Sequence, residues 1–139
     1  MNGEIELHKL FRDMKPQLHE GEFVFGLFNS LDAALAHNPI CLFQEAEGIT
    51  AILARQTADS AGISYSAICA WITLTVHSSL EAVGLTATVS GALTEADISC
   101  NVVAAYYHDH LFIPTKDADR AMQVLAALIE KQNEQQTDS

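Results

Sequence analysis

The sequence has no lysine or arginine between Gln56 and Thr115, and its 7 basic residues against 18 acidic ones give a formal net charge of −11. Proteins that bind nucleic acids neutralise phosphates with lysine and arginine, and anionic membrane surfaces attract clusters of the same residues. The charge distribution therefore argues against a nucleic acid or a membrane as the partner of this chain.

The sequence also lacks a signal peptide and a disulfide framework. Residues 1–6 contain no basic residue and no apolar stretch of the kind that directs secretion. Cys41, Cys69 and Cys100 are far apart and form no C-x-x-C pair. Three separated cysteines argue against a zinc finger and are typical of a reducing compartment. Both absences predict a cytoplasmic protein.

Charged side chains are absent from residues 60–80, which is a length that could cross a membrane. The serines and threonines in this stretch would need hydrogen-bond partners inside the hydrocarbon. A buried strand region explains the segment better than a membrane helix does.

Motifs that are typical of enzymes are missing as well. The sequence has no G-x-S-x-G elbow, no P-loop and no G-x-G-x-x-G turn. A cysteine nucleophile usually depends on a basic neighbour, and none of the three cysteines has one nearby in the sequence. We therefore predict a protein that is not an enzyme and has no catalytic residue and no cofactor.

The chain has 139 residues, of which 49% are hydrophobic, and this composition predicts a folded globular protein. A chain of this length holds one ordinary core or two small modules that pack on each other. Apolar spacing in the first half predicts a helix over 5–14, a strand over 22–28 and a brief helical stretch over 29–36. It then predicts a strand pair over 41–45 and 49–55 and about one helical turn over 57–61.

The second half repeats this order with longer helices. Its pattern predicts strand within 65–76, a helix over 84–93, a strand over 98–106 paired with 110–113, and a helix over 118–129. Residues 130–139 are polar and without period, which predicts a frayed end. Asn29–Ala33 resembles Ser78–Ala82 at an offset of 49 residues, and we interpret the halves as two copies of one unit.

Several segments resemble the small bacterial proteins that are made of two tandem ACT-like domains. They are 78–87, 98–104 and 106–114 in the second half, and 14–16, 23–25 and 45–50 in the first. Regulatory domains of aspartate kinase and the animal cytosolic arginine sensor are similar. The resemblance implies an α+β fold of two tandem ferredoxin-like βαββαβ units, with antiparallel sheets and helices on one face. We expect an N-terminal helix and first domain over 1–62, a second domain over 63–131 and a polar tail over 132–139.

The resemblance also implies a regulatory protein that binds a small ligand, most often an amino acid, at a domain interface in a homodimer. In such domains the ligand contacts the loop after the first strand and the start of the first helix. The implied site residues in that loop are His77, Ser78, Ser79, Leu80, Val83, Gly84 and Leu85. Cys100, Asn101 and Val102 are expected on the adjacent strand.

An amino acid ligand needs N–H donors for its carboxylate and acceptors for its ammonium group. Free N–H groups at a helix start suit the carboxylate, and Gly84 allows a close approach. An acid such as Asp97 suits the ammonium group. The alternative is that Ser78 and Glu81 form a capping box and satisfy these donors themselves.

His108 and His110 are two residues apart, so they point to the same side of a regular strand. They could line a ligand, hold a metal or support a hairpin, although a zinc site would need a third ligand that is not nearby. Glu45 and Glu47 have the same spacing and are interpreted as a solvated turn. Two alternative functions remain open: a protein-interaction module without a ligand, and a small metal-dependent enzyme that uses His108 and His110.

Overall fold

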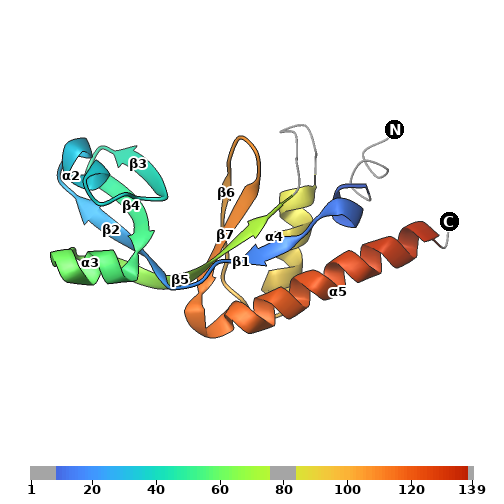
Figure 1. The fold of residues 1–139 in the computed structure, drawn as a ribbon. Helices are drawn as coiled ribbons and strands as arrows, with labels where there is room; N and C mark the ends of the chain where they lie inside the picture. The colour runs from blue at the N-terminus through green and yellow to red at the C-terminus, as the bar shows by residue number, and fades with distance from the viewer. Residues whose placement is uncertain (1–8, 76–83, 138–139) are drawn as a thin grey trace. The chain divides into compact units, whose positions relative to one another are not determined.

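The structure is a computed structural model that describes residues 9–75 and 84–137, with side chains through Glu134. The chain forms two compact units (Figure 1). Unit 2 is Glu20–Ala70, and unit 1 combines Met1–His19 with Trp71–Ser139.

Unit 2 has the complete βαββαβ order of a ferredoxin-like fold. Its elements are β2 (Phe23–Phe28), α2 (Leu31–Leu35), β3 (Cys41–Glu45), β4 (Gly48–Ala54), α3 (Arg55–Ala61) and the first part of β5 (Tyr65–Leu74). The strands lie in the order β3-β4-β2-β5, and each neighbouring pair is antiparallel. Both helices pack on one sheet face, because Ala34 of α2 and Ala58 of α3 share a core with Val24, Phe28, Ile49, Ala51 and Leu53.

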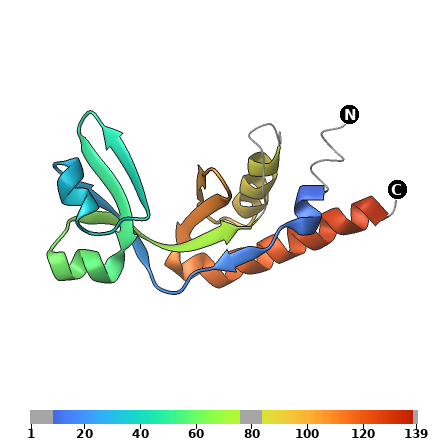
Figure 2. The same ribbon diagram turned by 45° about the horizontal axis from the view of Figure 1, so that its top comes forward.

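Unit 1 has the same strand order, but its parts come from both ends of the chain. Its elements are the second part of β5, α4 (Leu85–Glu95), β6 (Asn101–Ala104), β7 (Asp109–Pro114), the 3-10 turn η1 (Thr115–Asp117), α5 (Ala118–Thr137) and β1 (Pro16–Leu18), preceded by helical residues 9–13. The strands lie in the order β1-β5-β7-β6. The helix α5 runs along β1 in both views (Figures 1 and 2).

The N-terminal strand β1 completes the sheet of unit 1. Pro16, Gln17 and Leu18 pair antiparallel with Leu74, Thr73 and Ile72 of β5. No strand among the described residues follows α5, so β1 takes the place of the last strand of a βαββαβ unit. The single strand β5 is therefore the last strand of unit 2 and the first strand of unit 1.

The core of unit 1 lies between its sheet and the helices α4 and α5. Alternate residues of β5 and β7 point into it, namely Ile72 with Leu74 and Leu111 with Ile113. The helices contribute residues at helical spacing, which are Leu85, Val89 and Leu93 from α4 and Ala121 and Leu125 from α5. Phe11 and Met14 cover the same core from the N-terminal segment.

The fold class expected from the sequence is confirmed, and several element limits need correction. The helix α5 continues to Thr137, so the expectation of a frayed end from residue 130 is wrong. The residues beyond Glu130 are polar, but glutamate, lysine and glutamine favour helix. The strand β6 begins at Asn101 rather than Ile98, because the backbone N–H of Ile98 still donates to the carbonyl of Leu93 in the turn that ends α4.

The expected boundary between the two domains, between residues 62 and 63, stays a prediction. Residues 9–19 belong by their contacts to unit 1 because β1 pairs with β5. Within the described residues, no helix is both long and apolar enough to cross a membrane.

Candidate functional site

The start of α4 is the described part of the expected ligand loop. Gly84 is the N-cap residue of this helix and has φ 96° and ψ −13°, a backbone conformation that favours glycine. Its carbonyl accepts a 2.8 Å hydrogen bond from the backbone N–H of Thr88. Gly84 has no side chain that could accept a hydrogen bond, so it does not cap the first N–H groups of the helix.

Of the other residues expected in this loop, the structure describes only Leu85. His77, Ser78, Ser79, Leu80 and Val83 lie outside the described residues, as does Glu81 of the possible capping box. Leu85 is buried in the core of unit 1 beneath α4. Its side chain therefore packs the start of α4 against this core.

The corresponding helix start in unit 2 has its own acceptor. Ser30 is the N-cap residue of α2, and its hydroxyl oxygen accepts a 3.2 Å hydrogen bond from the backbone N–H of Ala33. Asp32 adds a negative charge to the first turn. The Ser30 hydroxyl therefore supplies the side-chain acceptor that Gly84 lacks.

Cys100, Asn101 and Val102 are not on a strand adjacent to β5, because β7 lies between β5 and β6. Cys100 and Val102 pack against the core of unit 1, and burial raises the pKa of the Cys100 thiol to about 11. Asn101 is exposed and pairs with Phe112. The part of these three residues in ligand binding stays a prediction.

Asp97 is at the far end of the helix that begins at Gly84. It follows α4 with φ 61°, and its backbone N–H donates to the carbonyl of Thr94 as the helix ends. The 11 residues of α4 separate it from Gly84. The structure does not bring these two residues together.

His110 lies beside the end of β5 that leads into residues 76–83. Its Nδ1 is 3.0 Å from Thr73 Oγ1, and it also accepts a 3.0 Å hydrogen bond from Trp71 Nε1. His19 completes this cluster, with Nε2 2.7 Å from Thr73 Oγ1. Sequence reasoning missed His19, because 54 residues separate it from Thr73 and no local pattern links them.

His108 precedes β7 and has a buried Nδ1 without a hydrogen-bond partner. Its neighbour Asp109 is buried, and burial raises the pKa of this carboxyl although His110 and His108 act in the opposite direction. No group of three potential metal ligands occurs among the described residues. The geometry thus gives His110 a place in a hydrogen-bonded cluster, while a metal role for His108 and His110 gains no third ligand there.

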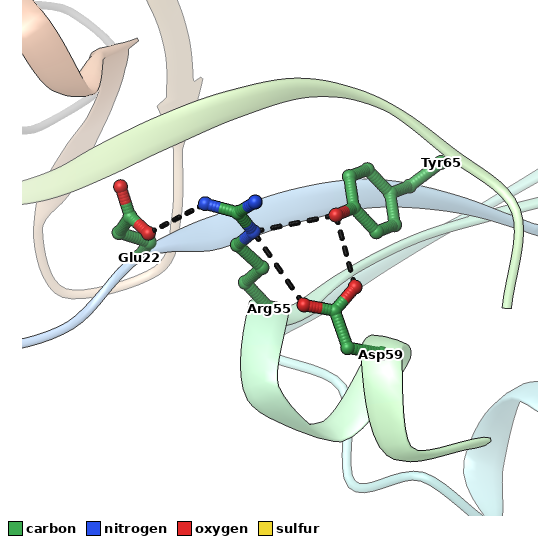
Figure 3. Close-up of polar contacts among 4 residues, drawn as sticks. All are labelled: Glu22, Arg55, Asp59 and Tyr65. Carbon is green, nitrogen blue, oxygen red and sulfur yellow. Dashed lines mark hydrogen bonds and ion pairs between the residues drawn. The ribbon is translucent and has the colours of Figure 1, made fainter. Parts of the chain in front are cut away.

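Unit 2 has a polar cluster around its single basic residue, Arg55 (Figure 3). Its guanidinium group donates to Glu22 at 2.9 Å and to the Tyr65 hydroxyl at 3.3 Å, and Asp59 lies 3.6 Å away. The hydrogen bonds to Tyr65 and Glu22 raise the pKa of Arg55. The cluster borders an open hollow of about 610 Å³ and ties the start of α3 to the segment before β2.

A second hollow in unit 2, of about 530 Å³, lies on the sheet face opposite the helices and includes Phe25, Leu27, Glu45 and Thr50. Thr50 donates a hydrogen bond of 2.5 Å to Glu45. Glu47 is exposed in the turn that follows β3. Glu45 and Glu47 therefore have different surroundings.

Comparison with known proteins gives two matches to one family. Residues 2–70 and residues 66–127 each match the ACT domain family, and the matches overlap within β5. No curated protein matches the sequence significantly.

Among solved structures, a Vibrio cholerae protein of unknown function, described as a possible transport protein, is 43% identical with a TM-score of 0.82. The match covers 92% of this chain and 99% of that one. Regulatory subunits of aspartate kinase from Thermus flavus and Thermus thermophilus are 12% and 10% identical, with TM-scores of 0.61 and 0.54. Each of these matches covers 81% of this chain and 95% of the other. At these identities the two subunits share the fold alone.

Proposed function

Because the chain belongs to the ACT domain family, we propose that it is a non-catalytic regulatory protein that binds an amino acid at the start of α4. The observation that carries this proposal is the N-cap at Gly84, a residue without a side chain that could cap α4. The N–H groups that follow it point out of the helix start, where the helix dipole also favours negative charge. A ligand carboxylate is the simplest group that satisfies both.

The charge of the chain is consistent with recognition through the backbone. No lysine or arginine occurs between Gln56 and Thr115, a stretch that includes Gly84 and all of α4. A carboxylate bound there would be held by N–H and hydroxyl groups unless a basic residue reaches in from another segment. Backbone donors fix the ligand's main-chain groups, and the surrounding side chains then select its identity.

The regulatory output in this proposal is a shift between conformations. A ligand changes such an equilibrium only by the difference between its affinities for the two states. A partner that recognises one of the states would then sense the ligand concentration.

Thermal unfolding in the presence of each of the twenty amino acids tests the proposal. A ligand at 100 times its Kd stabilises a folded protein by about 2.7 kcal/mol, which raises the melting temperature by several degrees. We expect one amino acid or a small group of them to produce this shift. No shift with any of the twenty would contradict the proposal for this class of ligand.

Two glycine variants locate the site. Gly84→Ala places a Cβ on a residue with φ 96°, and we expect it to abolish the ligand-dependent shift. Gly21→Ala is the matched control, because Gly21 has φ 92° and an added Cβ meets nothing within 4 Å. Both variants carry a similar backbone strain, so a site at α4 predicts that only Gly84→Ala loses the ligand response.

We also propose that the chain forms a homodimer through the sheet face of unit 2 opposite its helices. Leu27 and Phe43 both pair with Thr50, so the three side chains lie in one row on this face. Leu27 is 60% exposed and Phe43 is 69% exposed. Two large apolar side chains in one exposed row are typical of a surface that another protein covers.

Sedimentation equilibrium tests the dimer. Phe43→Ser should weaken the association, and Leu35→Ser, on the exposed part of α2, is the control that should leave it unchanged. Added salt should strengthen the dimer, because each chain carries a net charge of −11. A monomer at all concentrations would contradict this part of the proposal and leave the ligand site untouched.

A further inference from the structure

Four side chains from three neighbouring strands meet on the sheet face of unit 1 opposite its helices. They are His19 directly after β1, Trp71 and Thr73 of β5, and His110 of β7, and we call them the histidine latch. Their common face follows from strand alternation, because Ile72 and Leu74 of β5 and Leu111 of β7 point into the helix-covered core.

The latch joins the end of β1 to its neighbour β5 and, through Thr73 and Trp71, to β7 beyond it. The His19 ring stacks on the Trp71 ring with a centroid distance of 3.6 Å and an angle of 16°. His19 Nε2 lies 2.7 Å from Thr73 Oγ1, which in turn lies 3.0 Å from His110 Nδ1. Trp71 Nε1 donates to the same Nδ1 at 3.0 Å. Thr73 is only 5% exposed, so water cannot easily replace these partners.

The donors and acceptors fix where the protons are. An indole N–H only donates, so Nδ1 of His110 accepts and carries no proton. We assign the Thr73 hydroxyl as a second donor to the same Nδ1, so that its oxygen accepts from Nε2–H of His19. A proton on Nδ1 of His110 removes the acceptor on which this chain of hydrogen bonds ends.

We propose that the histidine latch is a pH-sensitive device in which protonation of His110 at Nδ1 breaks the Trp71 hydrogen bond and loosens β1 from the edge of β5. The strand β1 has only three paired residues, so its backbone pairing with β5 is weak by itself. Two further backbone hydrogen bonds flank it, from His19 N to Trp71 O at 2.9 Å and from Thr75 N to Lys15 O at 3.1 Å. Since unit 2 begins at Glu20, the latch includes His19, the last residue of unit 1 before the chain enters the other unit.

The surroundings of His110 set the pH range. Burial lowers the pKa of His110 below 6.5, His108 and His19 lower it further, and Asp109 acts in the opposite direction. Burial also lowers the pKa of His19. The residue of β6 opposite His110 is Val103, and Trp71 and Thr73 of β5 do not titrate in this range. These charges therefore keep the latch closed at neutral pH.

The sign of the effect follows from linkage. A histidine with a lowered pKa in the folded state binds more protons when unfolded. The latch contribution is fully present above the unfolded pKa of about 6.5 and is lost as the pH falls toward the folded pKa. Acidification should thus open the latch.

Trp71 is the only tryptophan of the chain, so its fluorescence reports directly on the latch. A titration of the full chain from about pH 8 to about pH 5 should show an emission change centred below pH 6.5. In His110→Gln this transition should be lost, because a glutamine oxygen can accept from Trp71 but does not titrate. His37→Gln is the control, since His37 lies in unit 2 and contacts the carbonyl of Ala33.

NMR of the wild-type protein keeps the test valid if His110→Gln does not fold. The Trp71 indole N–H resonance should move with the same midpoint as the His110 ring. The backbone amides of His19 and Thr75 should lose protection against hydrogen exchange at that midpoint. An emission transition that persists unchanged in a folded His110→Gln, or an indole resonance that stays fixed while His110 titrates, would overturn the proposal.

Discussion

Unit 1 and unit 2 have the same strand order but begin their first helices differently. In unit 2, Ser30 caps α2 with its own hydroxyl oxygen and Asp32 adds a negative charge to the first turn. In unit 1, Gly84 begins α4 without any side chain. The difference shows that one unit stabilises its first helix with a side-chain cap that the N-cap residue of the other unit does not supply, and we propose that a ligand takes that place.

The helices differ in length as well. The helices α2 and α3 of unit 2 have 5 and 7 residues, whereas α4 and α5 of unit 1 have 11 and 20. A short helix depends on its cap, because few internal hydrogen bonds hold it. The longer α4 is anchored by the core residues Leu85, Val89 and Leu93 and begins at an N-cap residue without a side chain.

The largest expected effect comes from shortening a buried side chain of α4, and the comparison is the same change at an exposed side chain of α2. Leu93 of α4 is fully buried, so Leu93→Ala should lower the free energy of unfolding by roughly 2–5 kcal/mol. Leu35 of α2 is largely exposed, so Leu35→Ala should cost less than about 0.5 kcal/mol. Urea unfolding measures both values. Equal losses would show that the two helices are anchored alike.

An intermediate effect tests the cap of unit 2. Ser30→Ala removes the acceptor for the Ala33 N–H, and we expect a loss of about 1 kcal/mol in the free energy of unfolding. Ser60→Ala is the control, because Ser60 is exposed within α3 and away from the helix start. If both variants are equally stable, the hydroxyl of Ser30 does not support α2.

The smallest expected effect concerns the ion pair of unit 2. Glu22→Gln removes the charge that faces Arg55 across 2.9 Å (Figure 3). Both side chains are partly exposed, so the loss should be smaller than that of Ser30→Ala and should shrink in salt. The neighbouring Glu20→Gln serves as the control for a change of net charge alone. A loss of several kcal/mol would instead place this cluster among the main supports of unit 2.

The sequence predicted the strands of unit 2 well, because their apolar residues and turns are local features. The predicted pair over 41–45 and 49–55 corresponds to β3 and β4, which begin and end within one residue of these limits. The strand β1 was missed, since three residues are too few to show alternation. Its identity depends on pairing with β5 more than 50 residues later in the chain, which no local pattern reveals.

In the candidate site, too, features that are local in the sequence could be predicted, whereas contacts that depend on the assembled fold could not. Gly84 could be identified from the family resemblance and from its place before a helical stripe. Asp97 follows the opposite end of α4 from Gly84, a separation that residue order does not show, and its part in ligand binding stays a prediction. The cluster of His19, Trp71, Thr73 and His110 depends on three strands meeting on one face, which only the assembled sheet reveals.

An NMR titration with amino acids tests the central claim most directly, because it reports on each backbone amide separately. If the start of α4 holds the ligand carboxylate, the amides of Leu85, Thr86 and Ala87 should shift and saturate, and those of Asp32 and Ala33 in unit 2 should not. Saturable shifts confined to other residues, with the amides of α4 unmoved, would contradict the account.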